Sequence, residues 1–479
     1  MQESKLLKQL KILEKEEFKG LYLFIHSTYF NQSKDVIRLF DYLRKYYPVF
    51  DSAKLNKEVV FKKLFPKQVY ADIKLRNLRT KAGKLVEQYL INLTFQQDDF
   101  QRKKLITQIY GQRNYYPAFE KNTQQLLDSL EQQPYRDACY FYDKYLLQKD
   151  YYLHIETAKK EQTVAIMQDA LTNLTHYFSL ERLFLGIDLI NREAIFSEKN
   201  HFNPQQAAID LPENNLICQL FQGIIALNKN QTEADFINLK ELYLNNINQI
   251  REIYSKEIFF FLTNHAIRQL KFKEQLYTQL LFQLYELGLQ RGLLLEKDKI
   301  EPGTFFNIVS ASSKLKKFEW ANQFIQTYQF HIAAPYSEET RQLSISYLNF
   351  NQGKYEAVIK LLSTRRFTNL FYQINVRTLL LRSYYKLFEQ NVTYYPLLIA
   401  QCESFIKLLQ RNQKLQENKK HATLLFTKLL KVIVESKYTG SYNREKKQQF
   451  LDIIHQSKGI TLQGWLVEIL DHLDTTIIS

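Results

Sequence analysis

The sequence predicts an all-α protein, and its composition is the first reason. Glycine (12 residues) and proline (9 residues) make up about 4% of the 479-residue chain, against roughly 12% in an average protein. Folds that contain β-sheets need many tight turns, and glycine and proline are prominent among the residues that form them. Leucine, lysine, glutamine, glutamate and isoleucine are abundant instead, and most of these favour helices. The aromatic residues, 14% of the chain, are expected to pack between those helices.

Chain length and one well-marked helical hairpin are the second and third reasons. A chain of 479 residues is too long for one compact core of ordinary size. Residues 344–385 have the pattern of two apolar helices and the start of a third, with the turn Asn351-Gln-Gly-Lys-Tyr355 between the first two. We expect a bend at this glycine, with Tyr355, Val358 and Leu361 packed inward. The sequence therefore predicts an α-solenoid of stacked antiparallel helical hairpins that follows an N-terminal helical module.

The N-terminal helical module is expected to span residues 1–96. Its predicted helices are Glu3–Leu13, Glu16–His26, Ser33–Tyr46, Lys57–Leu64 and Val69–Leu93. Asn56 can cap the fourth helix by accepting a hydrogen bond from a free backbone N–H. In the fifth helix, apolar residues recur at steps of three and four and form one stripe, which is typical of a helix that packs on a core. The stripe contains Leu75, Leu78, Ala82, Leu85, Val86, Tyr89 and Leu93.

Three further domains are predicted after this module, and all of them are helical. They are a helical hairpin region at 97–215, a second hairpin region at 216–303, and helical repeats with a basic C-terminal part at 304–479. The first of these is expected to contain helices Ala118–Leu130, Arg136–Thr157, Gln162–Tyr177 and Leu180–Phe196. A segment rich in turn residues, 201–215, is the predicted break before the second hairpin region.

The last domain shows the clearest repetition. Predicted helices begin at Phe318 and Tyr355, and the equivalent positions Ala321 and Val358 lie 37 residues apart, a spacing suited to a two-helix repeat. The stretch Gly353-Lys-Tyr-Glu-Ala357 resembles the turn and second-helix start of a tetratricopeptide repeat. Val358 takes the position of the usual alanine, and the Trp/Leu-Gly signature of the first helix is absent. The resemblance covers about 75–100 residues and implies a tetratricopeptide-like α-solenoid.

A second resemblance covers most of the chain. It rests on His26-Ser-Thr-Tyr-Phe-Asn31, Leu64-Phe-Pro66, Phe306-Asn-Ile-Val309 and Phe318-Glu-Trp-Ala321. These stretches are similar to a family of uncharacterised, wholly helical bacterial proteins. The resemblance implies an all-helical fold and no particular activity.

The positive charge is concentrated in two regions. The chain carries a net charge of +15, and residues 54–84 contain ten basic residues and two acidic ones. Such a segment is typical of contact with nucleic acid or with an acidic partner. The candidate contact residues are Lys62, Lys63, Lys67, Lys74, Arg76, Arg79, Lys81 and Lys84. A second basic region, residues 401–450, has eleven Lys and Arg residues and four Glu residues.

The first basic region also resembles a winged-helix DNA-binding domain. The resemblance rests on the pattern from Asn56 to Pro66 and on the helix that contains Leu75-Arg-x-x-Arg79, and it implies a helix that enters the major groove. Two observations favour an ordinary solvated helix face instead. On a helical wheel the basic residues of the long helix scatter around the solvated arc, and no β-hairpin wing is predicted after Leu90.

No motif of a known catalytic or binding site is found in the sequence. There is no phosphate-binding, dinucleotide-binding or metalloprotease motif, and no two of the nine histidines lie three or four residues apart. We therefore predict no catalytic, cofactor-binding or metal-ligating residue and no small-molecule substrate. The three cysteines are far apart, the N-terminus lacks a signal-peptide core, and no apolar run is long enough to span a membrane. These features predict a cytoplasmic protein.

Two functional hypotheses follow. The first is a non-enzymatic scaffold or adaptor that binds another protein along a helical-repeat surface. The alternative is a nucleic-acid-binding, possibly regulatory, protein that uses the basic segment 54–84.

Overall fold

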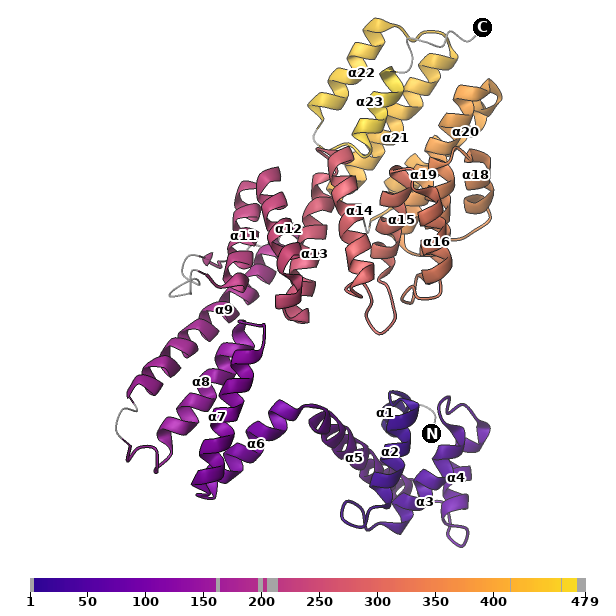
Figure 1. Ribbon diagram of the computed structural model, residues 1–479. Coiled ribbons are helices and arrows are strands. Elements are labelled where there is room, and N and C mark those ends of the chain that lie inside the picture. Colours follow the sequence, from indigo (N-terminus) through magenta and orange to yellow (C-terminus); the bar gives the residue numbers. More distant parts are fainter. Residues whose placement is uncertain are drawn as a thin grey trace. The chain divides into compact units, whose positions relative to one another are not determined.

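The computed structural model describes residues 4–160, 164–196, 201–204, 214–413, 415–457 and 459–471. Within these ranges the chain is helical throughout, and two isolated β-bridges, Glu296–Lys299 and Ile300–Ile332, are the only pairing of the strand type. The all-α prediction is therefore confirmed for the described residues. The chain divides between Phe221 and Gln222 into two compact units, here called the N-terminal and C-terminal units. Figure 1 shows the helices of each unit.

The N-terminal unit begins with a bundle built on one long helix. Its helices are α1 (Lys5–Lys11), α2 (Lys15–His26), α3 (Lys34–Leu43), α4 (Lys57–Leu64) and α5 (Asp72–Gln97), with 3₁₀ turns at Arg44–Tyr46 and Ala53–Leu55. The first four helices pack against α5 (Figure 1). The apolar stripe of α5 faces this core, and residues such as Leu75, Ala82 and Val86 are fully buried. The helices lie where the sequence predicts them, although α5 begins at Asp72 rather than Val69.

Local hydrogen bonds explain why these helices start where they do. The Asn56 side chain accepts a hydrogen bond from the backbone N–H of Glu58 at the start of α4, at 3.2 Å, as predicted. Ser4 caps α1 in the same manner, by accepting from the N–H of Leu7. At the start of α2, Glu14 and Glu17 form a reciprocal capping box. Each cap satisfies a backbone donor that has no partner within its helix.

The rest of the N-terminal unit is a series of longer helices. They are α6 (Asp99–Gln112), α7 (Tyr116–Gln132), α8 (Ala138–Leu153) and α9 (Val164–Phe196), and each packs against the next. The predicted break between Tyr177 and Leu180 is wrong, because α9 continues through it. No glycine or proline stands there, and Ser179 and Leu180 are buried inside the helix. The predicted loop at 201–215 falls mostly on residues 205–213, which lie outside the described residues.

In the C-terminal unit, most helices that follow one another in the sequence also pack together. They are α11 (Leu216–Asn230), which begins in the N-terminal unit, α12 (Glu233–Asn246), α13 (Glu252–Gln269), α14 (Glu274–Gln290), α15 (Pro302–Lys314), α16 (Phe318–Tyr328), α17 (Ser337–Asn351), α18 (Tyr355–Ser363), α19 (Leu370–Gln390), α20 (Tyr395–Arg411), α21 (Glu417–Tyr438), α22 (Arg444–Gln456) and α23 (Gln463–Asp471). Short 3₁₀ turns lie at Ile247–Gln249 and Val392–Tyr394. Alternate helices also meet, since α15 contacts α17 and α17 contacts α19.

The hairpin of α17 and α18 bends at Gly353, as predicted. This residue has a φ angle of +77°, in the left-handed region that glycine enters without steric cost. Helix α18 begins at Tyr355, and Val358 is fully buried while Ala357 is exposed. The inward position predicted for Leu361 is only partly right, because Leu361 is half-buried and Leu362 takes the buried position. The core-facing side of α18 is therefore centred on Val358 and Leu362.

Candidate functional site

The eight basic residues predicted as contacts all lie at the surface of the α1–α5 bundle. Lys62 and Lys63 are on α4, and Lys67 lies in the loop that leads to α5. The other five project from α5, on arcs outside its buried stripe. Seven of the eight side chains are exposed and Arg79 is half-buried. The apolar residues of this segment are buried in the core, and its cationic groups remain accessible to a ligand.

A groove lies between α1 and α5, and three of the predicted residues line it. Its volume is about 280 Å³. The lining residues are Ser4, Lys5, Leu6 and Gln9 from the α1 side, and Arg76, Arg79, Thr80, Gly83, Lys84 and Glu87 from α5. Four of these side chains are cationic and only one, Glu87, is anionic. We call this feature the α1–α5 groove.

The α1–α5 groove is bordered by three of the basic residues of α5. Arg76, Arg79 and Lys84 line it, whereas Lys74 and Lys81 lie outside it, in keeping with basic residues that scatter around the solvated arc of the helix. Arg76 and Arg79 are neighbours on the helix surface because they are three residues apart, while the five-residue step from Arg79 to Lys84 turns the helix by about 140°. Lys5 and Gln9, which complete the groove, were not predicted because they are distant in the sequence, 82 and 78 residues from Glu87.

Glu87 organises one end of the groove. Lys5 Nζ lies 2.8 Å from Glu87 Oε1, and Gln9 Nε2 donates to the same oxygen at 2.9 Å. The hydrogen bond from Lys5 and its positive charge lower the pKa of the Glu87 carboxyl, so that this group is ionised at neutral pH. Lys5 and Glu87 offset one another, which leaves the positive charge of the groove on Arg76, Arg79 and Lys84.

The two arginines of the groove have unused hydrogen-bonding capacity. The Arg76 guanidinium forms no hydrogen bond or ion pair with the described residues. Arg79 Nε is buried and also lacks a partner, as does the buried Oε1 of Gln9. Both atoms have almost no solvent-accessible surface, so neighbouring protein atoms cover them, and the accessible donors of the groove are those of Arg76 and of the outer part of Arg79. Arginine is well suited to anions, since its planar fork matches phosphate and carboxylate oxygens.

Lys74 is less available than the arginines. Its Nζ donates to Gln68 Oε1 at 2.7 Å and lies 4.1 Å from the centre of the Phe65 ring. Nearby, Lys57 Nζ pairs with Asp72 Oδ1 at 3.1 Å. These contacts hold the loop between α4 and α5. Lys74 is therefore better described as a residue that positions this loop than as part of the groove.

Three of the eleven basic residues at 401–450 form ion pairs with acidic side chains. Lys431 pairs with Glu403 and Glu435, Lys420 pairs with Glu417, and Lys447 pairs with Asp471. Lys437 is largely buried and hydrogen-bonds the hydroxyl of Tyr385, where burial lowers the pKa of Lys437 to about 8. An open hollow of about 620 Å³ on α20 is lined by Lys407 and Arg411, but Glu403 shares it. This region is a weaker candidate for an anion site than the α1–α5 groove.

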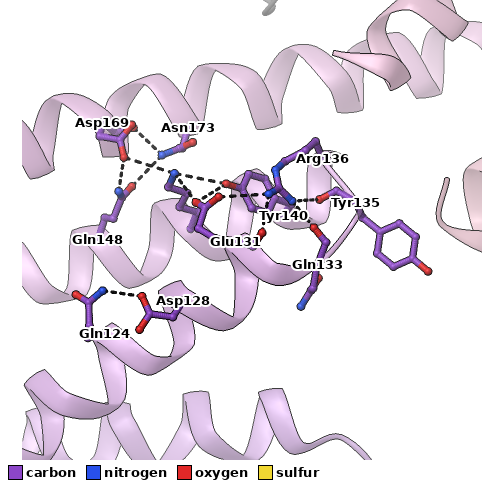
Figure 2. Close-up of polar contacts among 11 residues, drawn as sticks. Gln124, Asp128, Glu131, Gln133, Tyr135, Arg136, Tyr140, Gln148, Asp169 and Asn173 are labelled. Atoms are coloured by element: carbon purple, nitrogen blue, oxygen red, sulfur yellow. Dashed lines mark hydrogen bonds and ion pairs between the residues drawn. The ribbon is translucent and has the colours of Figure 1, made fainter. Parts of the chain in front are cut away.

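A polar network joins α7, α8 and α9 in the N-terminal unit (Figure 2). Glu131 accepts hydrogen bonds from Tyr140 Oη at 2.7 Å and from Lys144 Nζ at 2.9 Å. Burial alone would raise the pKa of Glu131, but these hydrogen bonds outweigh it and the pKa is lowered. Lys144 Nζ also lies 3.8 Å from Asp169 Oδ2 on α9. The charged groups of this network satisfy one another, so it stabilises the packing of three helices and offers no open chemistry.

The described residues contain no cluster of three or more histidine, cysteine, aspartate or glutamate side chains that could hold a metal ion. Among the helices of the described chain, none is both long enough and apolar enough to cross a membrane. A scan against protein-family models found no match, and searches of curated proteins and of solved structures found no similar chain. The functional interpretation of the α1–α5 groove therefore rests on its geometry and charge.

Proposed function

We propose that the protein is a non-enzymatic adaptor whose N-terminal module binds nucleic acid through the α1–α5 groove. The observation that carries this proposal is that Arg76, Arg79 and Lys84 line one groove, with the Arg76 guanidinium unpaired among the described residues. Phosphate oxygens are the natural partners of such groups, and they contribute most of the affinity of non-specific nucleic-acid binding. Lys62, Lys63 and Lys67 add exposed positive charge on the same bundle.

The salt dependence of binding tests this proposal. We expect the full chain to bind short labelled DNA and RNA strands, with an affinity that falls steeply between about 50 and 200 mM salt because counterions are released from the phosphates. Removal of one phosphate contact lowers the slope of log K against log salt by about one. Arg76→Ala should show this change, measured by fluorescence anisotropy.

Lys419→Ala is the matched control, since Lys419 is an exposed cation of the second basic region. It changes the net charge by the same amount and should leave the slope unchanged. Absence of binding at about 50 mM salt, where electrostatic binding is strong, would exclude the proposed function. An equal effect of the two variants would show that net charge, and not the groove, attracts the nucleic acid.

A second candidate function is a protein scaffold, carried by the C-terminal unit. We propose that helices α13 to α21 form an α-solenoid, because helices adjacent in sequence pack together and α17 also contacts both α15 and α19. Stacked helix pairs of this kind expose extended surfaces to which proteins bind.

The cysteines Cys139, Cys218 and Cys402 form no disulfide, which supports a reducing, cytoplasmic location.

The scaffold proposal is tested by purifying the chain from cells together with the proteins bound to it and cross-linking the mixture. We expect cross-links between a co-purified protein and lysines of α14 to α21, such as Lys314, Lys360 and Lys407. Loss of the same partner from a variant with these three lysines changed to glutamate would support the repeat surface as its binding site. Cross-links confined to the α1–α5 bundle would contradict it.

A further inference from the structure

The outward face of α9 carries a row of large apolar side chains spaced seven residues apart. They are Val164, Leu171, Phe178 and Leu185, and Leu189 follows four residues later. All five are between 42% and 64% exposed, whereas the inward-facing Ala170, Leu183 and Ile187 are at most 5% exposed. Single exposed apolar residues are ordinary, but a continuous row of them indicates a surface that another molecule covers.

The seven-residue spacing is the period at which α-helices pair in a coiled coil. Each step of seven falls about 20° short of two full helical turns, so the row stays on one side of α9. A second position lies four residues after each member of the row, and these positions hold Gln168, Thr175, Arg182 and Leu189. We call the two sets together the α9 seam. It runs from Val164 to Leu189, about 37 Å along the helix axis.

The α9 seam is complementary to itself when two copies run antiparallel. In this register Val164 of one copy lies opposite Leu189 of the second, and Phe178 lies opposite Thr175. Arg182, the one charged residue of the seam, lies opposite Leu171, and the apolar stem of an arginine packs well on such a side chain. A parallel pair would place Arg182 against Arg182, so that like charges meet. Antiparallel pairing is therefore favoured.

The exposed area of the seam is sufficient for a specific dimer. Half-exposed side chains of this size leave roughly 100 Å² each in solvent, so five of them bury about 1,000 Å² in total over two copies, the lower limit for a specific interface. The half-buried Met167 and Leu174 border the seam and add to this area. We propose that the protein forms a homodimer in which the α9 seams of two copies pack antiparallel. This inference does not depend on the nucleic-acid-binding function proposed above.

Sedimentation equilibrium of the full chain tests the inference. We expect a reversible monomer–dimer equilibrium at micromolar concentration. Leu171→Lys should weaken the dimer at least about 100-fold, because two buried leucines are lost per dimer and each contributes about tenfold or more. Leu23→Lys is the matched control, since Leu23 is 70% exposed on α2, outside the seam, and its replacement should leave the dimer unchanged.

The register has a test of its own. Leu171→Glu places a carboxylate opposite Arg182 in the antiparallel pair and should weaken the dimer less than Leu171→Lys does, whereas in a parallel pair both variants set like charges against each other. Under mild oxidation, the Val164→Cys/Leu189→Cys double variant should form disulfides between copies, because these positions are too far apart on one helix to join. Val164→Cys alone should not cross-link. Cys139→Ser serves as the background for both, since Cys139 is the exposed natural cysteine among the described residues.

The outcomes separate the seam from its register. A monomer at every concentration, or equal weakening by Leu171→Lys and Leu23→Lys, would overturn the inference. A dimer in which Val164→Cys cross-links by itself would overturn the antiparallel arrangement. All of these substitutions are at exposed positions, and circular dichroism of each variant shows whether its helices are retained.

Discussion

Replacement of Val358 by aspartate should destabilise the C-terminal unit by about 4 kcal/mol or more, the typical cost of an unpaired charge placed in a core. Val358 is fully buried at the first turns of α18, in a cluster with Leu343, Leu362 and Leu379. The side chains named here are apolar and offer no hydrogen-bond partner, so an aspartate among them has to remain unpaired or take up a proton at a free-energy cost. The Arg382 guanidinium contacts the cluster at Phe350, 4.4 Å from the centre of that ring. The lost contacts of the valine methyl groups add to this cost.

Ala357→Asp is the matched control for this prediction. Ala357 is the preceding residue of the same helix and is exposed, so the same carboxylate should change the free energy of unfolding by no more than about 0.5 kcal/mol. Hydrogen exchange of the α17–α19 amides and urea denaturation of the full chain measure both effects. Equal destabilisation by the two variants would mean that α18 does not present the Val358 face to its neighbours. It would also mean that Val358 is not the buried residue equivalent to the usual alanine of a tetratricopeptide repeat.

The N-terminal helices could be predicted from local signals, because those signals agree with the packing. In α5 the apolar residues keep a period close to that of a helix, and nearly all of that stripe is buried. Asn56 caps α4 as its residue type predicts. At Gly353 the turn needs a positive φ angle, which few other residues tolerate, so the bend is encoded by a single residue.

The break predicted inside α9 shows where such signals fail. The sequence predicts two helices, Gln162–Tyr177 and Leu180–Phe196, where the structure has one. A helix ends where a breaker or a cap replaces its hydrogen bonds. Ser179 is of a residue type that often caps helices, but here Ser179 and Leu180 are buried within one continuous helix. Packing against α8 therefore decides the length of α9, and this contact cannot be read from the segment itself.

The α1–α5 groove could be predicted only in part, for a related reason. Its arginines are visible in the sequence as part of a basic segment, but Lys5 and Gln9 reach them through the packing of α1 on α5. One local signal was present. A glycine inside a long helix costs about 1 kcal/mol relative to alanine, so Gly83 indicates a place where a side chain would obstruct something. In the structure, that obstruction is the Gln9 amide.

His265 gives the C-terminal unit a pH-dependent stability. The imidazole lies on α13 and is 2% exposed, with its ring stacked on Phe236 at 5.5 Å between centroids and with Nε2 buried without a partner. Burial lowers the pKa of His265 from 6.5 to about 4, and the nearby positive charge of Arg268 contributes to the shift. The native protein thus holds this imidazole neutral at pH values where an unfolded chain would protonate it.

The sign of the effect follows from which state binds the proton. Between pH 6.5 and about 4 the unfolded chain carries a proton on His265 that the folded chain does not, so acidification through this range favours unfolding. Each pKa unit is worth about 1.4 kcal/mol. Because the unfolded chain is already partly protonated near pH 7 and the folded chain is partly protonated near pH 4.5, the total over this range is about 2 kcal/mol. His265→Phe retains an aromatic ring between Phe236 and Tyr277 and has no proton to bind. We therefore expect urea denaturation at about pH 7 and about pH 4.5 to show a loss of stability that is larger by up to about 2 kcal/mol in the natural protein than in this variant. The two proteins share every other titrating group, so an identical pH dependence would show that protonation of His265 does not oppose folding.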